Sequence, residues 1–206
     1  MDGEKQKVFN SVVSIGRMTN HDVSRADEDI VGDALVQKEA FALLVHRYQE
    51  RLARYMRRLG VLRREDMEDV LQNVFLKTYR NLNEFDRRLK FSSWIYRITH
   101  NEAMSFFRST SSRPEGHPVD DAELVLEQLS GQSDTSMEAE LGLNATQLTE
   151  ALKKLEAKYR DVIVLRYFEE REYAEISDIL RLPTGTVATL LNRAKKRLRE
   201  QLSHLA

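Results

Sequence analysis

Proline is scarce in this chain of 206 residues, and its placement restricts the fold more than any other sequence feature. The three prolines are Pro114, Pro118 and Pro183, so residues 1–113 contain none. Strands joined by tight turns need frequent proline, glycine, Asn-Gly or Asp-Gly positions, and the eight glycines are widely scattered. The sequence therefore predicts an all-α fold.

Apolar residues between positions 41 and 59 recur every three or four residues, the spacing that places side chains on one face of a helix. Gly60 follows, and glycine commonly ends a helix in the left-handed conformation. The acids in residues 65–69 predict the start of a second helix, because carboxylates stabilise the positive end of a helix dipole. A third helix is predicted over residues 92–108. The apolar positions of the first two helices are Phe41, Leu44, Val45, Tyr48, Leu52, Tyr55 and Leu59, then Met67, Val70, Leu71, Val74, Phe75 and Thr78.

A change in composition divides the chain into two predicted small helical domains. Residues 111–145 contain many acidic residues but only one basic residue, Arg113. Proline, glycine and serine interrupt any helical period there. This composition is typical of a flexible acidic linker. Residues 1–33 are also polar, and we expect a disordered tail there. The two helical domains are then residues 34–110 and residues 146–206.

The second domain has the pattern of a helix-turn-helix. A short helix is predicted over residues 173–180 and a tripeptide turn over residues 181–183, followed by a long helix from its candidate N-cap, Thr184, to about Leu202. In this motif the first residues of the second helix meet base edges in the major groove, and cations further along suit phosphates. The predicted core residues are Ala174, Ile176, Ile179, Leu180, Val187, Leu191 and Leu198. The predicted base-edge residues are Thr184, Thr186, Val187, Thr189 and Leu190, and the cations are Arg193, Lys195, Lys196, Arg197 and Arg199.

Composition excludes several kinds of site. The chain has no cysteine, which rules out a disulfide framework, a thiolate zinc site, an iron–sulfur cluster and a cysteine nucleophile. The five histidines show no metal-ligand spacing, and no Ser/His/Asp order, P-loop or glycine-rich phosphate cradle occurs. No secretory signal is visible, and no apolar run approaches the roughly 20 residues that cross a bilayer. We therefore expect a cytoplasmic protein that is not an enzyme and has no catalytic residue, metal or cofactor.

Three segments carry a family resemblance. The first is residues 68–79, EDVLQNVFLKTY, with an acidic pair, aliphatic residues, Gln, Phe-Leu and an aromatic. The second is residues 91–101, FSSWIYRITHN, with Phe, Trp-Ile-Tyr-Arg-Ile and Asn. The third runs over residues 173–194, from YAEI through PTGTV to Arg-Ala. In this order, with an acidic linker before the third, they resemble the bacterial RNA polymerase sigma factors of the extracytoplasmic-function (ECF) group in the sigma-70 family.

The resemblance implies a sigma factor that binds core RNA polymerase, recognises the −10 and −35 promoter elements and assists strand opening. It implies sigma domain 2 in the first helical domain and sigma domain 4 in the second. In the family, polymerase is contacted at the clamp coiled coil of the largest subunit and at the flap of the second-largest subunit. Many members are held inactive by an anti-sigma factor, so we expect such a partner besides promoter DNA. The implied clamp contacts are Asp69, Gln72, Asn73, Phe75 and Leu76.

The second segment and the loop before it combine the groups that opening a DNA duplex requires. Unstacked bases need aromatic faces, the displaced strand needs cations, and base edges need amides. The family captures a flipped base in the loop before this helix, which corresponds here to residues 83–90. Trp94 has two interpretations, a core residue of an amphipathic helix or a stacking platform for a base. The implied −10 contacts are Phe85, Arg87, Arg88, Lys90, Phe91, Ser92, Trp94, Arg97, Asn101 and Arg108.

The third segment departs from the family pattern within the long helix. After Gly185-Thr186-Val187 the family typically has a basic residue, a serine and an arginine, where this chain has Ala188, Thr189 and Leu190. A base contact by each missing cation would contribute about 1–3 kcal/mol. We therefore expect either weak binding or readout through hydroxyls, methyl groups and DNA shape. The implied −35 contacts are Tyr173, Thr184, Thr186, Val187, Thr189, Asn192, Arg193 and Lys196.

Two other functions are compatible with the sequence. A degenerate sigma-like adaptor would bind polymerase or an anti-sigma protein without reading promoters, and Ala188 and Leu190 favour it. A stand-alone helix-turn-helix repressor would be dimeric and would bind palindromic DNA without polymerase. The net charge of −1 fits a protein that binds free DNA weakly.

Overall fold

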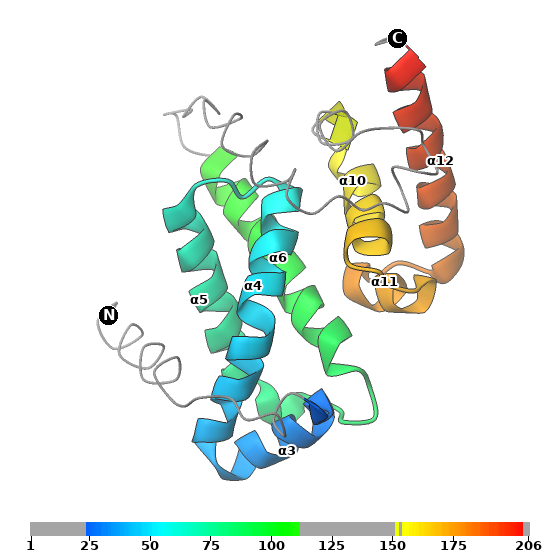
Figure 1. Cartoon of the computed structure of the whole chain (residues 1–206). Coiled ribbons are helices and arrows are strands. Elements are labelled where there is room, and N and C mark those ends of the chain that lie inside the picture. Colours follow the sequence, from blue (N-terminus) through cyan, green and yellow to red (C-terminus); the bar gives the residue numbers. More distant parts are fainter. Residues whose placement is uncertain (1–23, 112–150, 153, 204–206) are drawn as a thin grey trace. The chain divides into compact units, whose positions relative to one another are not determined.

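The computed structural model describes residues 24–111, 151–152 and 154–203 (Figure 1). Every secondary-structure element assigned in these ranges is a helix, which confirms the all-α prediction. Contacts between Cα atoms divide the chain into two compact units, residues 1–54 with 64–108 and residues 55–63 with 109–206. The predicted acidic linker falls almost entirely outside the described residues.

The first unit is built around three long helices that lie side by side in Figure 1. Contacts join them in pairs: the Phe41 and Tyr79 rings pack with centroids 5.1 Å apart, and Lys77 donates a hydrogen bond to Glu102. The elements are α3 (Asp27–Val36), η1 (Lys38–Ala40), α4 (Phe41–Leu59), α5 (Arg64–Arg80), η2 (Leu82–Glu84) and α6 (Phe91–Ser111), of which the last residues of α4 and α6, 55–59 and 109–111, are grouped with the second unit.

The sequence predicted α4 closely. All seven residues of its apolar stripe are buried, and the helix ends at Leu59. Gly60 follows with a φ of 113°, and its amide donates to the carbonyl oxygens of Met56 and Arg57. A side chain is strained at that φ, so the glycine is required by the backbone conformation that ends the helix. In α5 the predicted core residues are buried apart from Leu71, which is half-buried.

The first unit begins earlier than the sequence indicated. The predicted disordered tail included residues 24–33, but α3 starts at Asp27 and buries Ile30 and Val31 completely. Acids in its first turn favour a helix start, and the Asp27 carboxylate accepts hydrogen bonds from Arg47 and Tyr48 of α4. Residues 1–23 lie outside the described residues.

The second unit contains α10 (Ala157–Ile163), the π-helical turn η3 (Val164–Phe168), α11 (Tyr173–Leu180) and α12 (Thr184–Ser203). Helix α12 packs against both α10 and α11. The core consists of buried side chains from all four elements, including Val162, Ile163, Leu165, Ile176, Ile179, Val187, Leu191, Ala194 and Leu198. Two of the predicted core residues lie elsewhere, because Ala174 is exposed and Leu180 is half-buried.

A short turn joins α11 to α12, as the helix-turn-helix pattern predicted. Arg181 adopts the left-handed conformation with φ 57° and ψ 43°, and the Ser177 hydroxyl donates to the Leu182 carbonyl oxygen. The carbonyl oxygen of Pro183 accepts the first backbone hydrogen bonds of α12, from Thr186 and Val187. Thr184 is therefore the first helical residue, and the N-cap is Pro183, one position before the predicted N-cap Thr184.

Candidate polymerase and promoter interface

The predicted clamp contacts on α5 separate into one outward face and one core residue. Asp69 and Asn73 are exposed, and Gln72 and Leu76 are half-buried. Spacings of three, four and seven residues place these four on the same side of the helix. Phe75 is 2% exposed, so it lies in the core as its place in the apolar stripe predicted, and its assignment as a clamp contact stays a prediction. Its ring lies on the inward face of α5, together with the buried side chains of Val74 and Thr78.

The loop before α6 is organised by an internal ion pair. The Asp86 carboxylate accepts hydrogen bonds from the Arg88 amide at 3.0 Å and from the Arg88 guanidinium at 2.7 to 3.1 Å. These hydrogen bonds lower the pKa of Asp86 to about 2. The Leu89 amide donates to the Asp86 carbonyl oxygen, which closes the turn. The loop consequently presents exposed Arg88, Leu89 and Lys90 side chains from a fixed backbone.

A cluster of aromatic residues packs at the two ends of this loop. Phe91 is fully buried and Phe85 is 7% exposed, so both lie in the core, and their assignment as −10 contacts stays a prediction. The two rings pack edge to face with centroids 5.5 Å apart, and Phe91 also meets the Tyr48 ring at 5.6 Å. Trp94 lies against both, at 5.1 Å from Phe85 and 5.8 Å from Phe91, and is only half-buried. Both sequence interpretations of Trp94 therefore have support, since it packs on core aromatics and retains exposed surface.

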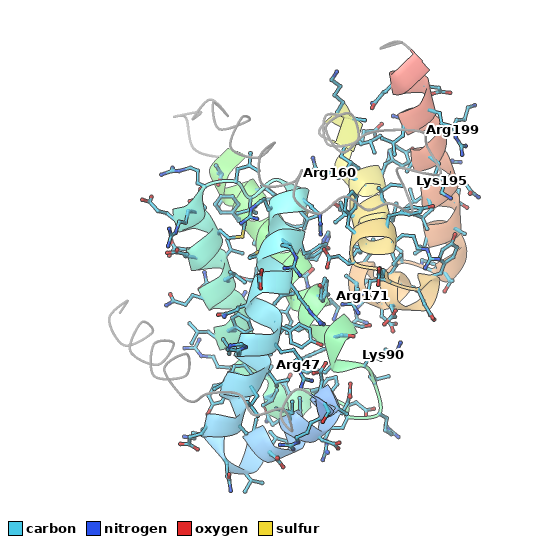
Figure 2. The ribbon with its side chains drawn as sticks, in the orientation of Figure 1. Arg47, Lys90, Arg160, Arg171, Lys195 and Arg199 are labelled. Atoms are coloured by element: carbon cyan, nitrogen blue, oxygen red, sulfur yellow. The ribbon has the colours of Figure 1, made fainter. Side chains whose placement is uncertain are left out.

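Helix α6 continues the surface that starts at Trp94. Arg97 is half-buried, and Asn101 and Arg108 are exposed. Steps of three and seven residues align these three with Trp94 along one side of the helix. Ser92 is half-buried near the start of the helix, and Lys90 is exposed just before it (Figure 2). Of the other predicted −10 residues, Arg87, Arg88 and Lys90 thus lie on the loop, and Trp94, Arg97, Asn101 and Arg108 lie on one helix face, which Ser92 does not share.

Helix α12 carries all the predicted −35 residues except Tyr173, which is the exposed first residue of α11. Six of the predicted contacts are exposed on this helix, namely Thr184, Thr186, Thr189, Asn192, Arg193 and Lys196. Val187 is fully buried, as its place among the predicted core residues indicated, and its assignment as a −35 contact stays a prediction. Ala188 and Leu190, where the family pattern has cations, are half-buried. The Thr189 hydroxyl donates to the Gly185 carbonyl oxygen at 2.9 Å, so its oxygen remains able to accept.

Cations lie over tyrosine rings in the second unit. The Arg166 guanidinium lies 5.5 Å from the ring of Tyr173, which is 38% exposed. The Lys195 ammonium lies 5.2 Å from the Tyr167 ring. Figure 2 shows Lys195 and Arg199 along α12 and Arg171 near α11. The sequence prediction missed Arg166 and Tyr167, although a basic residue next to two aromatics at residues 166–168 was the available signal.

The sequence prediction also missed the part of α3 that contacts the loop before α6, at residues 86–90, which we call the −10 loop after its predicted role. The Arg87 Nε donates to the Glu28 carbonyl oxygen at 2.9 Å, and the Phe91 amide donates to the Glu28 carboxylate at 2.8 Å. These partners lie about sixty residues apart in the chain, so no local sequence pattern could have indicated them. Within the described ranges there is no cluster of His, Cys, Asp and Glu suited to a metal ion, and no helix long and apolar enough to span a membrane.

Comparison with known families assigns both units. Residues 44–113 match the model of sigma-70 region 2, and residues 145–198 match that of sigma-70 region 4. The chain is 33% identical over 177 residues to the ECF RNA polymerase sigma factor SigW of Bacillus subtilis, covering 82% of this chain and 91% of SigW. It is 29% identical over 191 residues to the ECF sigma-E factor of Escherichia coli, covering 86% and 97%.

Two solved structures share the fold. CnrH, in a complex with the cytosolic domain of CnrY, has a TM-score of 0.65 at 23% identity and covers 88% of this chain and 100% of that one. The sigma factor RpoE of Bartonella quintana, in a complex with the anti-sigma factor NepR, has a TM-score of 0.58 at 21% identity and covers 79% and 96%. From the two matching regions and the level of identity to SigW, this chain belongs to the ECF group of the sigma-70 family and is an RNA polymerase sigma factor.

Proposed function

We propose that this sigma factor assigns polymerase binding and −10 recognition to its first unit and −35 recognition to its second. The observation that supports this division is the pairing of each family region with one exposed surface. Region 2 contains the outward faces of α5 and α6, and region 4 contains the exposed face of α12. Domain 2 would extend to about residue 110, as the sequence indicated, and domain 4 would begin near residue 146.

The polymerase surface is the outward face of α5. This face combines a carboxylate, two amides and an aliphatic group, from Asp69, Gln72, Asn73 and Leu76. Gln72 and Leu76 are half-buried, and the other two are exposed. Such a patch suits a partner helix that offers cations and apolar side chains. We assign the clamp coiled coil of the largest subunit to this face and the flap of the second-largest subunit to the second unit.

The −10 surface is the loop at residues 86–90 together with one side of α6. Arg88 and Lys90 supply cations for the backbone of the displaced strand, and Asn101 supplies an amide for a base edge. Trp94 offers a ring face for an unstacked base while its other side rests on Phe85 and Phe91. Capture of a base on this surface opens the duplex by binding, without covalent chemistry.

The −35 surface is the exposed face of α12. Its first turns carry threonine hydroxyls and Asn192, and its cations, Arg193 and Lys196, come later. Hydroxyls and amides read base edges more weakly than bidentate arginines, so phosphate contacts and DNA shape supply more of the binding. This arrangement yields a −35 preference that depends strongly on salt.

We further propose that the protein acts in the cytoplasm, catalyses no reaction of its own and is controlled by an anti-sigma factor. Support for the last point is that the RpoE structure holds an anti-sigma factor. Such a partner would cover surfaces that polymerase or DNA otherwise occupies, and the exposed faces of α5 and α12 are the candidates.

Transcription from a genomic promoter library, with purified core polymerase and this chain as the sole specificity factor, tests the proposal. We expect discrete start sites that share −10 and −35 motifs. The double variant R193A/K196A should weaken use of these promoters and reduce the slope of log affinity against log salt by roughly 2. The control is Lys38→Ala, which removes an exposed cation from η1 in the first unit.

The same experiment separates the alternatives. Co-elution with core polymerase without specific starts would replace the proposal with the adaptor function, which Ala188 and Leu190 on α12 favour. Specific DNA binding by a dimer in the absence of polymerase would replace it with the repressor function. Asp69→Ala should reduce binding to core polymerase and leave the −35 preference of the assembled complex unchanged.

A further inference from the structure

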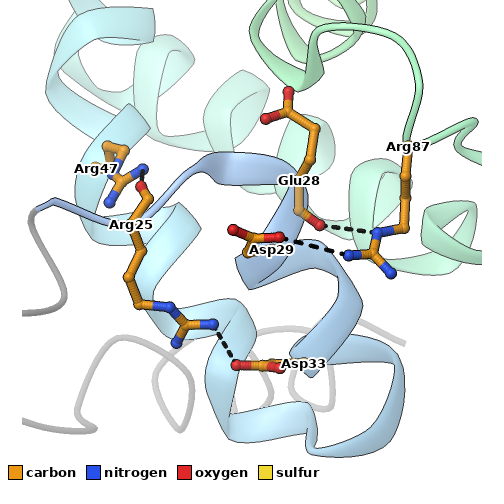
Figure 3. Close-up of polar contacts among 6 residues, drawn as sticks. All are labelled: Arg25, Glu28, Asp29, Asp33, Arg47 and Arg87. Atoms are coloured by element: carbon orange, nitrogen blue, oxygen red, sulfur yellow. Dashed lines mark hydrogen bonds and ion pairs between the residues drawn. The ribbon is translucent and has the colours of Figure 1, made fainter.

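Helix α3 contacts both ends of the loop at residues 86–90, and Figure 3 shows the contacts with Arg87 at one end. At one end the Arg87 Nε donates to the Glu28 carbonyl oxygen at 2.9 Å, and the Arg87 guanidinium lies 3.7 Å from the Asp29 carboxylate. At the other end the Phe91 amide donates to the Glu28 carboxylate at 2.8 Å. One residue of α3, Glu28, therefore contacts the loop through both its backbone and its side chain.

The contact with Phe91 is a helix cap supplied by a distant segment. Phe91 is the first residue of α6, and the first four amides of a helix have no partner within it. A carboxylate at this position satisfies one amide and also interacts favourably with the positive end of the helix dipole. Glu28 thereby fixes where α6 begins and where the preceding loop ends.

The contact with Arg87 depends on a glycine in α3. A Cβ atom at Gly32 would lie 2.7, 2.8 and 2.9 Å from the three terminal atoms of the Arg87 guanidinium. Only glycine allows the guanidinium to rest against the helix at this distance, although glycine costs about 1 kcal/mol relative to alanine within a helix. The Arg87 side chain is still 51% exposed, so the guanidinium remains accessible to a phosphate.

The helix itself is anchored firmly enough to act as a support. Ile30 and Val31 are fully buried, and Asp27 accepts hydrogen bonds from Tyr48 and Arg47 of α4. The Tyr48 ring in turn packs against Phe91, so the anchor and the capped end of α6 share one core.

We propose that α3 is part of the promoter-opening machinery, with Glu28 and Gly32 as positioning residues that set the Arg87 guanidinium and the start of α6 for the −10 strand. This inference rests on the proposed function of the −10 surface. A loop that is already ordered loses less conformational entropy when it binds the displaced strand than a mobile loop would. The role is separate from polymerase binding, because the proposed clamp face on α5 carries none of these contacts.

The Gly32→Ala variant separates positioning from folding. Alanine favours the helix, so thermal stability should stay the same or rise, while the flexible guanidinium is displaced from its site. With the full chain and core polymerase, we expect unchanged affinity for core and about a fivefold slower promoter opening, as for loss of one aligned phosphate contact. Permanganate reactivity of unpaired thymines measures the opening rate.

Two companion variants complete the test. In an Arg87→Ala background, Gly32→Ala should have no further effect on opening, because the displaced group is already absent. Glu28→Ala should slow opening and speed amide hydrogen exchange at Phe91, and Glu28→Gln should restore most of both, since its amide oxygen still accepts the hydrogen bond. Wild-type opening rates for Gly32→Ala, or a defect that persists without Arg87, would overturn the positioning role. If the wild-type protein opens no promoter at all, the proposed function fails first and this inference fails with it.

Discussion

The ring of Trp94 lies 5.1 Å from the ring of Phe85, and Trp94 is the more exposed of the two residues. Phe85 is 7% exposed, whereas Trp94 retains open surface beside the −10 loop. The buried Phe85 ring thus supports the half-buried Trp94 ring. Substitutions at these two positions should separate stability from promoter opening, although both residues come from the same short segment.

Phe85→Ala should lower the free energy of unfolding by about 3–5 kcal/mol, because it empties an aromatic site in the core. Urea unfolding monitored by fluorescence of Trp94, the sole tryptophan, measures this directly. Leu89→Ala is the matched control, since Leu89 belongs to the same segment but is 60% exposed, and it should cost under about 1 kcal/mol. A normal stability for Phe85→Ala together with lost promoter opening would instead make Phe85 a base contact.

Helix periodicity predicted the elements well because these helices bury one regular stripe. Helix α4 with the glycine that ends it, and the bounds of α11, follow from local spacing alone. Helix α3 was missed because its first residues, Asp27, Glu28 and Asp29, read as a solvated acidic tail. Two of these acids bind partners on α4 and α6 that only the folded chain brings near.

Periodicity was less informative about the candidate site. A family motif combines core residues and contact residues without separating them, and Phe75, Phe91 and Val187 were assigned to contacts on that basis. Burial shows that all three pack inward. The helical repeat by itself predicted Val187 as a core residue, because Val187 shares the stripe of Leu191 and Leu198. The roles of the exposed residues remain predictions.

Arg181→Gly should stabilise the second unit by about 1 kcal/mol. Arg181 adopts a φ of 57°, a conformation that costs a residue with a Cβ atom roughly 1–2 kcal/mol and glycine almost nothing. Arg181→Ala is the control, because it removes the same guanidinium but keeps the Cβ atom, and it should give no gain. Thermal unfolding of the two variants compares them, and equal melting temperatures would show that backbone strain is not the cause.

Acid should weaken the first unit through His100. Burial lowers the pKa of His100 to about 4 from its ordinary value of 6.5, so the unfolded chain binds a proton that the folded one excludes. Stability is therefore intact above pH 6.5 and falls as the pH drops toward 4, by at most about 3 kcal/mol. His100→Gln should flatten this part of the profile, as measured by urea unfolding with Trp94 fluorescence. An identical acid loss in the variant would assign the effect to other groups.

The second unit should respond to pH in the opposite sense through Asp161 of α10. This side chain is 7% exposed, and burial raises the pKa of its carboxyl from 3.8 to about 7, against the attraction of the neighbouring Arg160 charge. Between these two values the folded chain binds a proton that the unfolded chain has released. Stability is therefore greatest below about pH 4 and decreases as the pH rises to 7, by about 4 kcal/mol.

Asp161→Asn replaces the carboxyl by a neutral amide of the same shape and should abolish that decrease, so that the variant is more stable than the wild type at pH 8 and similar to it at pH 4. Hydrogen exchange of the α10 amides at the two pH values reports on this unit alone, free of the His100 contribution in α6. Asp178→Asn, which removes a negative charge from an exposed position on α11, controls for the change in net charge. A folded pKa above the unfolded one requires that ionisation of Asp161 destabilise the folded chain. Equal exchange rates for the wild type and Asp161→Asn at pH 8 would therefore contradict the raised pKa.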